Sequence, residues 1–122
     1  MGIIDYRDSR PIFEQISDHY KQLILMGVLE PGEKMPSVRA LSVEIATNPN
    51  TIQKAYAELE REGFCYSVAG KGSFVTEDID RLLGKKKDEL IGKMRSLRGE
   101  AGHLGMDADK LWQESGKGGH ND

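Results

Sequence analysis

The chain has 122 residues, of which 38% are hydrophobic and 30% charged, and this globular composition leaves room for one small domain with an appendage. It has no run of about 18 apolar residues and no apolar signal region near its start, so we expect a cytoplasmic protein without a membrane span. The net charge is −3, with eight basic and eleven acidic residues in 1–77 and nine of each in 78–122, so any nucleic-acid site must depend on where particular residues fall.

The first predicted helix follows Ser9, which is the expected cap, and Pro11 suits its first turn, where a missing N–H is not needed. Gly27 ends this helix, and the Pro31-Gly32 pair predicts a turn after it. Apolar residues recur at helical spacing and form the inward face: Phe13, Ile16, Tyr20, Leu23 and Ile24.

Two shorter helices with a tight connection are predicted next. Ser37 can cap a helix that stops near Ala46. Asn48-Pro49 favours an extended or turn conformation, and Asn50 can cap a third helix over about 51–62. The inward faces of the two helices are Val38, Leu41, Ile45, Ile52, Ala55, Tyr56 and Leu59. Two helices joined by so short a turn form a helix-turn-helix.

Two β-type runs, 64–68 and 73–76, follow the third helix and are separated by a glycine-containing loop. This pattern predicts a hairpin, and a hairpin in this place is the wing of a winged helix. The predicted fold class is therefore mainly α (α+β), a winged helix-turn-helix with a two-stranded wing over 1–77.

A helical tail is predicted over 78–115. Gly84 and Gly92 weaken the prediction of one unbroken helix over 78–97, and the glycines of 98–105 predict a break. Asp107 is the expected cap of a short last helix through Trp112, and 116–122 are expected to be disordered.

The second helix of a helix-turn-helix lies in the major groove, with its N-terminal residues at the base edges. Here these residues are Asn50, Thr51, Gln53 and Lys54. Asn and Gln can pair with adenine through two hydrogen bonds, Lys suits guanine or phosphate, and a helix N-terminus favours phosphate. The same residues would equally suit a solvated helix face.

Two further basic residues occupy places that such a module presents to DNA. Arg39, in the first turn of the second helix, suits a bidentate contact to guanine or phosphate, or else a surface ion pair. Lys71 lies between Gly70 and Gly72 at the wing tip, where glycines let the backbone approach a phosphate, although an ordinary hairpin tip has the same composition. Each feature alone is ambiguous, but their order along the chain indicates a DNA-binding module.

Five motifs occur in order at consistent separations. They are PIFEQI at 11–16, GVLEPGEKMPSVRAL at 27–41, NPNTIQKAY at 48–56, LEREG at 59–63 and GKGSFV at 70–75. Together they resemble the GntR family of bacterial transcription regulators over about residues 8–77. The resemblance implies a winged helix with operator DNA as its ligand. The residues expected to contact DNA are Ser37, Arg39, Asn48, Asn50, Thr51, Gln53, Lys54, Gly70, Lys71 and Gly72.

The short tail is similar to that of the YtrA subfamily, in which a pair of helices replaces the effector domain and mediates dimerisation. This chain departs from the family pattern at Met35, where Leu is usual, and at Ser42, where Ala is usual. Ala46-Thr47 also replaces the usual Gly-Val. We expect these changes to leave the fold intact and to affect the turn between the helices, and hence the operator preference.

Apolar residues of the tail must be buried either on the winged helix or on a second copy. They are Leu82, Leu83, Leu90, Ile91, Met94 and Leu97. Because isologous contacts are the usual form of self-association, we expect a homodimer that reads an inverted repeat with half-sites about 34–36 Å apart. The expected function is a sequence-specific regulator, most simply a repressor. The alternative is a winged-helix module for protein–protein interaction that does not read DNA.

Neither an enzyme nor a cofactor or metal site is expected, because His19, His103 and His120 lack metal-ligand spacing and no nucleophile–base pair stands out. The single cysteine, Cys65, is interpreted as a small buried hydrophobe. The 45 residues 78–122 are too few for the metabolite pocket of larger family members. A small-molecule effector of unknown identity, bound between protomers, is left open.

Overall fold

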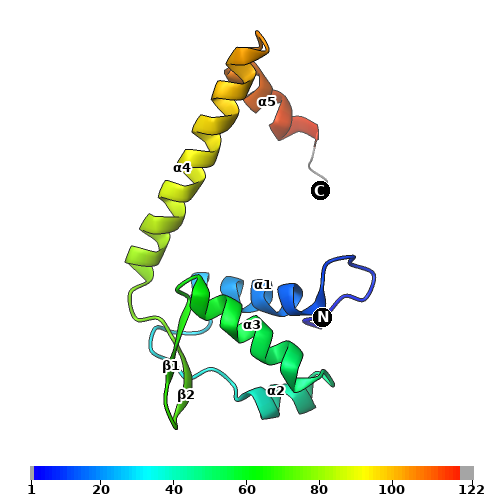
Figure 1. Ribbon diagram of the computed structural model, residues 1–122, viewed down its shortest axis with the longest axis vertical. Helices are drawn as coiled ribbons and strands as arrows, with labels where there is room; N and C mark the ends of the chain where they lie inside the picture. Colours follow the sequence, from blue (N-terminus) through cyan, green and yellow to red (C-terminus); the bar gives the residue numbers. More distant parts are fainter. Residues whose placement is uncertain (1, 119–122) are drawn as a thin grey trace. The chain divides into compact units, whose positions relative to one another are not determined.

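The computed structural model describes residues 2–118 and divides the chain into two compact units, Met1–Leu82 and Leu83–Asp122. In chain order the elements are α1 (Ile12–Leu25), α2 (Val38–Glu44), α3 (Pro49–Arg61), β1 (Cys65–Val68), β2 (Gly72–Val75), α4 (Ile79–His103) and α5 (Ala108–Gly118) (Figure 1). The predicted fold class, a winged helix-turn-helix followed by a helical tail, is confirmed. Within residues 2–118, no helix is both long and apolar enough to cross a membrane.

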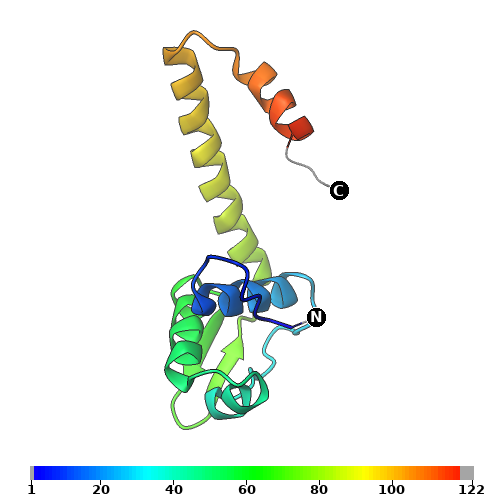
Figure 2. The same cartoon turned by 90° about the vertical axis from the view of Figure 1, so that its right-hand side faces the viewer.

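The core of the first unit lies between α1, α2, α3 and the hairpin. Its buried residues are Ile16, Tyr20, Ile24, Met35, Leu41, Ile52, Ala55, Tyr56, Leu59, Phe64, Cys65, Val75 and Leu82. The other predicted inward residues of the three helices, Phe13, Leu23, Val38 and Ile45, pack against this core half-buried. The helical spacing of apolar residues therefore identified the inward faces correctly. The α3 helix lies across α1 (Figures 1 and 2).

Cys65 is buried in this core, as predicted. Desolvation is the main reason that the pKa of its thiol rises to about 12. At neutral pH the thiol is therefore protonated and unreactive, as expected for a cysteine that serves as a small hydrophobe.

The hairpin pairs Cys65 with Val75 and Val68 with Gly72, in antiparallel register. The sequence predicted only a turn before α2, but the chain leaves that turn as an extended segment along the free edge of β2. The Met35 N–H donates to the Ser73 carbonyl at 2.8 Å, and the Val75 N–H donates to the Glu33 carbonyl at 2.8 Å. The wing is consequently held by hydrogen bonds on both edges of β2.

Two of the predicted helix caps are wrong. Ser9 does not cap α1; Pro11 occupies the N-cap position, with no side-chain hydrogen bond. Asn50 does not cap α3; Asn48 does, accepting from the Asn50 N–H at 2.8 Å, and Pro49 fills the first helical position. Proline suits that position because its missing N–H would have no helical partner. The predicted cap Ser37 is confirmed, and its hydroxyl accepts from the Ala40 N–H at 3.0 Å.

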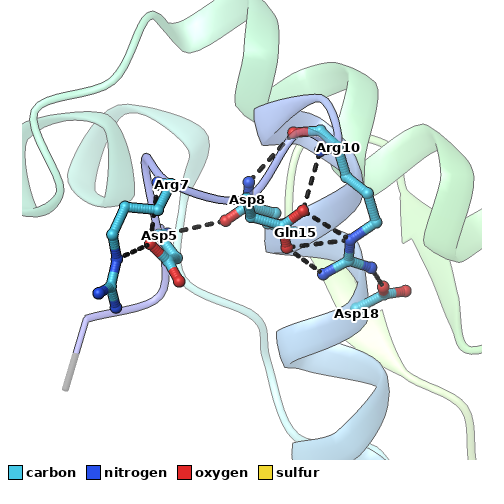
Figure 3. A network of polar contacts seen from close by, with 6 residues as sticks. All are labelled: Asp5, Arg7, Asp8, Arg10, Gln15 and Asp18. Carbon is cyan, nitrogen blue, oxygen red and sulfur yellow. Dashed lines mark hydrogen bonds and ion pairs between the residues drawn. The ribbon is translucent and has the colours of Figure 1, made fainter.

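The segment before α1 is tied to that helix by a polar network (Figure 3). The buried side chain of Gln15 accepts from the Asp5 N–H at 2.8 Å and donates to the Arg10 carbonyl at 3.1 Å. Arg10 pairs with Asp8 and Asp18, and its guanidinium holds the pKa of the Asp8 carboxyl below the usual value. These contacts, in place of a Ser9 cap, fix the start of α1.

The predicted break over 98–105 is wrong, because α4 is continuous to His103. Its glycines face open space, and each is tolerated within a long run of good helix formers at a cost of about 1 kcal/mol. The helix ends where Gly105 adopts φ +73° and the Met106 N–H donates to the Ala101 carbonyl.

Asp107 caps α5, as predicted, by accepting from the Asp109 N–H at 2.9 Å. This helix extends to Gly118, past the predicted end and into the segment 116–122 that was expected to be disordered. Residues 119–122, with His120, lie outside the described residues.

Candidate nucleic-acid interface

The first turns of α3 present polar side chains to solvent while the opposite face enters the core. Asn50 and Gln53 are exposed, Thr51 is half-buried, and Ile52 lies between them with no exposed surface. Within residues 2–118, the side chains of Asn50 and Gln53 make no hydrogen bond to the protein. Their amide groups are therefore available to a ligand that approaches this end of α3.

Lys54 is exposed on the same helix, but unlike the side chains of Asn50 and Gln53 its side chain contacts another helix. Its Nζ lies 4.1 Å from the centroid of the Phe13 ring on α1, a cation–π contact. The contact holds the ammonium group over α1 without removing its charge. Lys54 is consequently suited to a phosphate on one flank of α3 rather than to a base edge at its tip.

The α3 helix is anchored to the segment that precedes α2. The Tyr56 hydroxyl donates to the Pro36 carbonyl at 2.8 Å. Burial is the largest cause of the raised pKa of this phenol, so it stays protonated and keeps its role as a donor. The bond joins the middle of α3 to the residue before the cap of α2 and so fixes the two helices of the motif to each other.

In α2, Ser37 and Arg39 have different roles. The Ser37 hydroxyl is used in the cap, so a DNA contact would have to share its oxygen. Arg39 is exposed, and in the described part of the chain its guanidinium has no ion pair or hydrogen bond. The surface ion pair that was the alternative interpretation of Arg39 is thus not present.

The wing turn runs from Val68 to Lys71, whose N–H donates to the Val68 carbonyl at 2.9 Å. Gly70 is the third residue of this turn and has φ +75°, a conformation that favours glycine. Gly72 has φ +114°, and a Cβ there would lie 3.2 Å from Lys34 Cε. Lys71 is left exposed at the tip.

Lys34 is a basic residue of this surface that the sequence analysis missed. It is exposed, and its backbone bridges Phe74 of β2, so its side chain lies beside Gly72. No local pattern marked it, because its place depends on pairing with a strand some forty residues later in the chain. It adds a second cation to the wing next to Lys71.

In both views, α2, the N-terminal end of α3 and the wing turn lie at the same end of the first unit (Figures 1 and 2). The structure therefore brings to one end the three segments that carry the ten predicted DNA-contact residues, namely the start of α2, the first turns of α3 and the wing turn. The acidic residues of α3 lie in its other half, where Glu58 pairs with Arg61 and Glu60 accepts from the Ser67 hydroxyl. This separation explains how an acidic unit can offer a locally polar and basic surface.

Residues 12–75 match the sequence profile of the bacterial regulatory proteins of the gntR family. The chain belongs to the GntR family. It is 42% identical over 109 residues to the HTH-type transcriptional repressor YtrA of Bacillus subtilis (strain 168), an alignment that covers 88% of this chain and 84% of the repressor. The resemblance inferred from the sequence motifs is confirmed.

Solved GntR structures share the fold. A GntR family transcriptional regulator from Listeria monocytogenes has a TM-score of 0.65 and 36% identity, with 93% of this chain and 98% of that one covered. The DNA-binding domain of AraR, solved in complex with operator ORR3, has a TM-score of 0.54 and 29% identity, with 62% of this chain and 92% of that one covered.

Two of the three departures from the GntR pattern, Ser42 and Ala46-Thr47, meet at the turn between α2 and α3. Ala46 has φ +50°, a left-handed conformation that costs an L-residue roughly 1–2 kcal/mol and that the usual glycine would adopt freely. The hydroxyl of Ser42, another departure, donates to the Thr47 carbonyl at 2.6 Å. Met35 simply takes a core position, buried where Leu is usual.

The tail of this GntR chain leaves most of its predicted dimerisation residues exposed. Leu82 is the exception, because it is 6% exposed and belongs to the core of the first unit. The others, Leu83, Leu90, Ile91, Met94 and Leu97, are exposed apolar residues of α4. The core of the winged helix thus extends into the first turn of α4, beyond the boundary at residue 77 expected from the sequence.

Within the second unit, α4 and α5 enclose an apolar groove of about 440 Å³. Residues of both helices and of the turn between them line it, among them Met94, Leu97, Ala101, Leu104, Met106 and Trp112. An ion pair of 2.9 Å between Arg98 and Asp109 joins the helices beside it. Met106 and Trp112 were not predicted to be part of an apolar surface, since the sequence pattern there indicated only a short, separate helix.

Proposed function

We propose that this GntR chain is a sequence-specific DNA-binding repressor that acts in the cytoplasm as a homodimer. The observation that carries the proposal is the surface at one end of the first unit, where the free amides of Asn50 and Gln53 lie with the unpaired guanidinium of Arg39 and the wing. A relative with the same fold is bound to operator DNA, which supports a DNA ligand here.

The geometry divides the surface into base-reading and phosphate-binding parts. Asn50 and Gln53 point from the start of α3 and suit base edges, while Arg39 suits guanine or phosphate. The first backbone N–H groups of α3, near Thr51, suit a phosphate. Lys34 and Lys71 at the wing, and Lys54 beside α1, supply charge to the DNA backbone.

The homodimer is proposed from the second unit. A helix with a row of exposed Leu, Ile and Met side chains needs a partner, and a second copy provides the same row. The groove between α4 and α5 is lined mostly by apolar side chains, so we assign it to contact between protomers rather than to an effector.

Selection of duplexes from a randomised library tests the function. We expect an inverted repeat with half-sites about one helical turn apart. By fluorescence anisotropy at physiological salt, the selected duplex should bind about 10³-fold or more tightly than its shuffled version. Failure to enrich any sequence, with equal binding to both duplexes, would contradict the proposal and favour a winged helix that binds proteins.

A further inference from the structure

The turn between α2 and α3 contains a strained residue directly before the proposed reading helix. Ala46 is the single non-glycine residue with positive φ in the described part of the chain, at +50°. An L-residue in this region crowds its Cβ against the following carbonyl, so it stays there only when neighbouring contacts hold it.

Ser42 and Thr47 provide those contacts from either side of Ala46. The Ser42 hydroxyl donates to the Thr47 carbonyl at 2.6 Å, and the Thr47 N–H donates back to the Ser42 carbonyl at 3.0 Å. The Thr47 hydroxyl adds a bond of 3.1 Å to the Ile45 carbonyl. Ala46 cannot relax to a right-handed or extended conformation without moving Thr47 and breaking the reciprocal pair.

The position of Thr47 fixes the start of α3. Asn48, the next residue, caps the helix through its 2.8 Å bond from the Asn50 N–H, and Pro49 is the first helical residue. A shift of the Thr47 carbonyl therefore moves the cap, and with it the first turn that carries Asn50 and Gln53.

We propose that Ser42 is a positioning residue for DNA recognition. Its hydroxyl holds Ala46 in the left-handed conformation and so sets the orientation in which α3 presents Asn50 and Gln53 to base edges. The inference rests on the proposed function, since a surface that reads no bases has no need of a fixed orientation.

A double-mutant cycle tests the proposal with full-length protein and the duplex selected from the randomised library. Ser42→Ala should lower affinity for the selected duplex about fivefold, the typical effect of one lost hydrogen bond, and leave affinity for the shuffled duplex unchanged. Adding Ala46→Gly should restore most of the loss, because glycine adopts positive φ without the contact. Ser67→Ala is the matched control: it removes a 2.8 Å bond from a serine hydroxyl to the Glu60 carboxylate, in the other half of α3.

Amide hydrogen exchange tests the same inference without DNA. In Ser42→Ala, the N–H groups of Asn50, Thr51 and Ile52, which bond to Asn48, should exchange faster than in the wild type, and in Ser67→Ala they should not. Unchanged exchange at these amides would overturn the inference. Equal loss of affinity on both duplexes, or no recovery with Gly at position 46, would also overturn it. If the wild type prefers no sequence, the proposed function fails, whatever the exchange result.

Discussion

The two units of this chain differ in how far their apolar side chains are buried. The first unit buries its apolar helix faces around one core and exposes polar groups at the end that carries the proposed DNA interface. The second unit buries Ala101, at 4% exposure, yet leaves Leu97 and Trp112 about two-thirds exposed, at 64% and 65%. A helix pair without a covered apolar face does not form a stable core by itself. The first unit thus has a buried core of its own, whereas the exposed side chains of the second support the proposal that a second copy covers them.

The largest effect is expected from a substitution that introduces a charged side chain into the exposed apolar row of the second unit. Leu90→Asp should produce monomers and lower affinity for the selected inverted repeat by about 10²- to 10⁴-fold, because each half-site then binds without the other. Analytical ultracentrifugation and anisotropy measure the two effects. Val28→Asp, at a residue of the first unit that is 60% exposed, is the matched control and should remain dimeric. A dimeric Leu90→Asp protein would contradict the proposed interface.

Shortening a side chain to alanine should destabilise the first unit when the residue lies in its core, but not when it lies in the tail. Ile52→Ala leaves a cavity at a fully buried site, so we expect a loss of about 2–5 kcal/mol in the free energy of unfolding of that unit. Leu97→Ala should leave that free energy unchanged. Denaturant titrations followed by the near-ultraviolet signal of tyrosines measure it. Equal effects of the two substitutions would mean that the units share one core.

The proposed reading residues should affect specificity without affecting stability. Arg39→Ala and Gln53→Ala should each cost about 1–3 kcal/mol in binding the selected duplex, and little on the shuffled one. Arg61→Ala, whose arginine pairs with Glu58 at the other end of α3, and Gln22→Ala on α1 are the matched controls. Equal weakening on both duplexes would exclude base reading by the residue concerned.

The smallest effects are expected from the two lysines of the wing. Lys34→Ala and Lys71→Ala should weaken binding to all sequences alike, and each should reduce the slope of log K against log salt by about 0.9. Lys110→Ala, in α5, serves as the control. An unchanged slope would remove that lysine from the phosphate contacts.

Local patterns in the sequence identified most of the first unit. Helical spacing of apolar residues defined the inward faces of α1, α2 and α3, because one face of each helix enters a single core. The caps were harder, since Asn48 and Asn50 are both good N-cap residues and only the fit of Pro49 at the first position decides between them. The wing could also be located from a local pattern, because its two strands and the glycines of its turn are close together in the sequence.

Features that depend on distant parts of the chain could not be predicted. Lys34 joins the wing only because β2 returns to pair with its segment. Leu82 looked like the start of a dimer face, but it packs in the core beside Gly63, with its Cδ1 3.6 Å from where a Cβ on that glycine would lie. In α4, the propensities of single glycines suggested a break, whereas the sum over the whole helix favours continuity.

The pairing of 32–35 with β2 has a kinetic consequence. These hydrogen bonds close a loop of chain that contains all of α2 and α3. Closing a loop between distant segments loses chain entropy that only later contacts recover, so the sheet should order after the helices and be among the first parts to open. A partly folded chain would then have α3 formed, but its wing would not yet be paired with residues 32–35. The contribution of Lys34 and Lys71 to binding the DNA backbone would be completed only in the last step of folding.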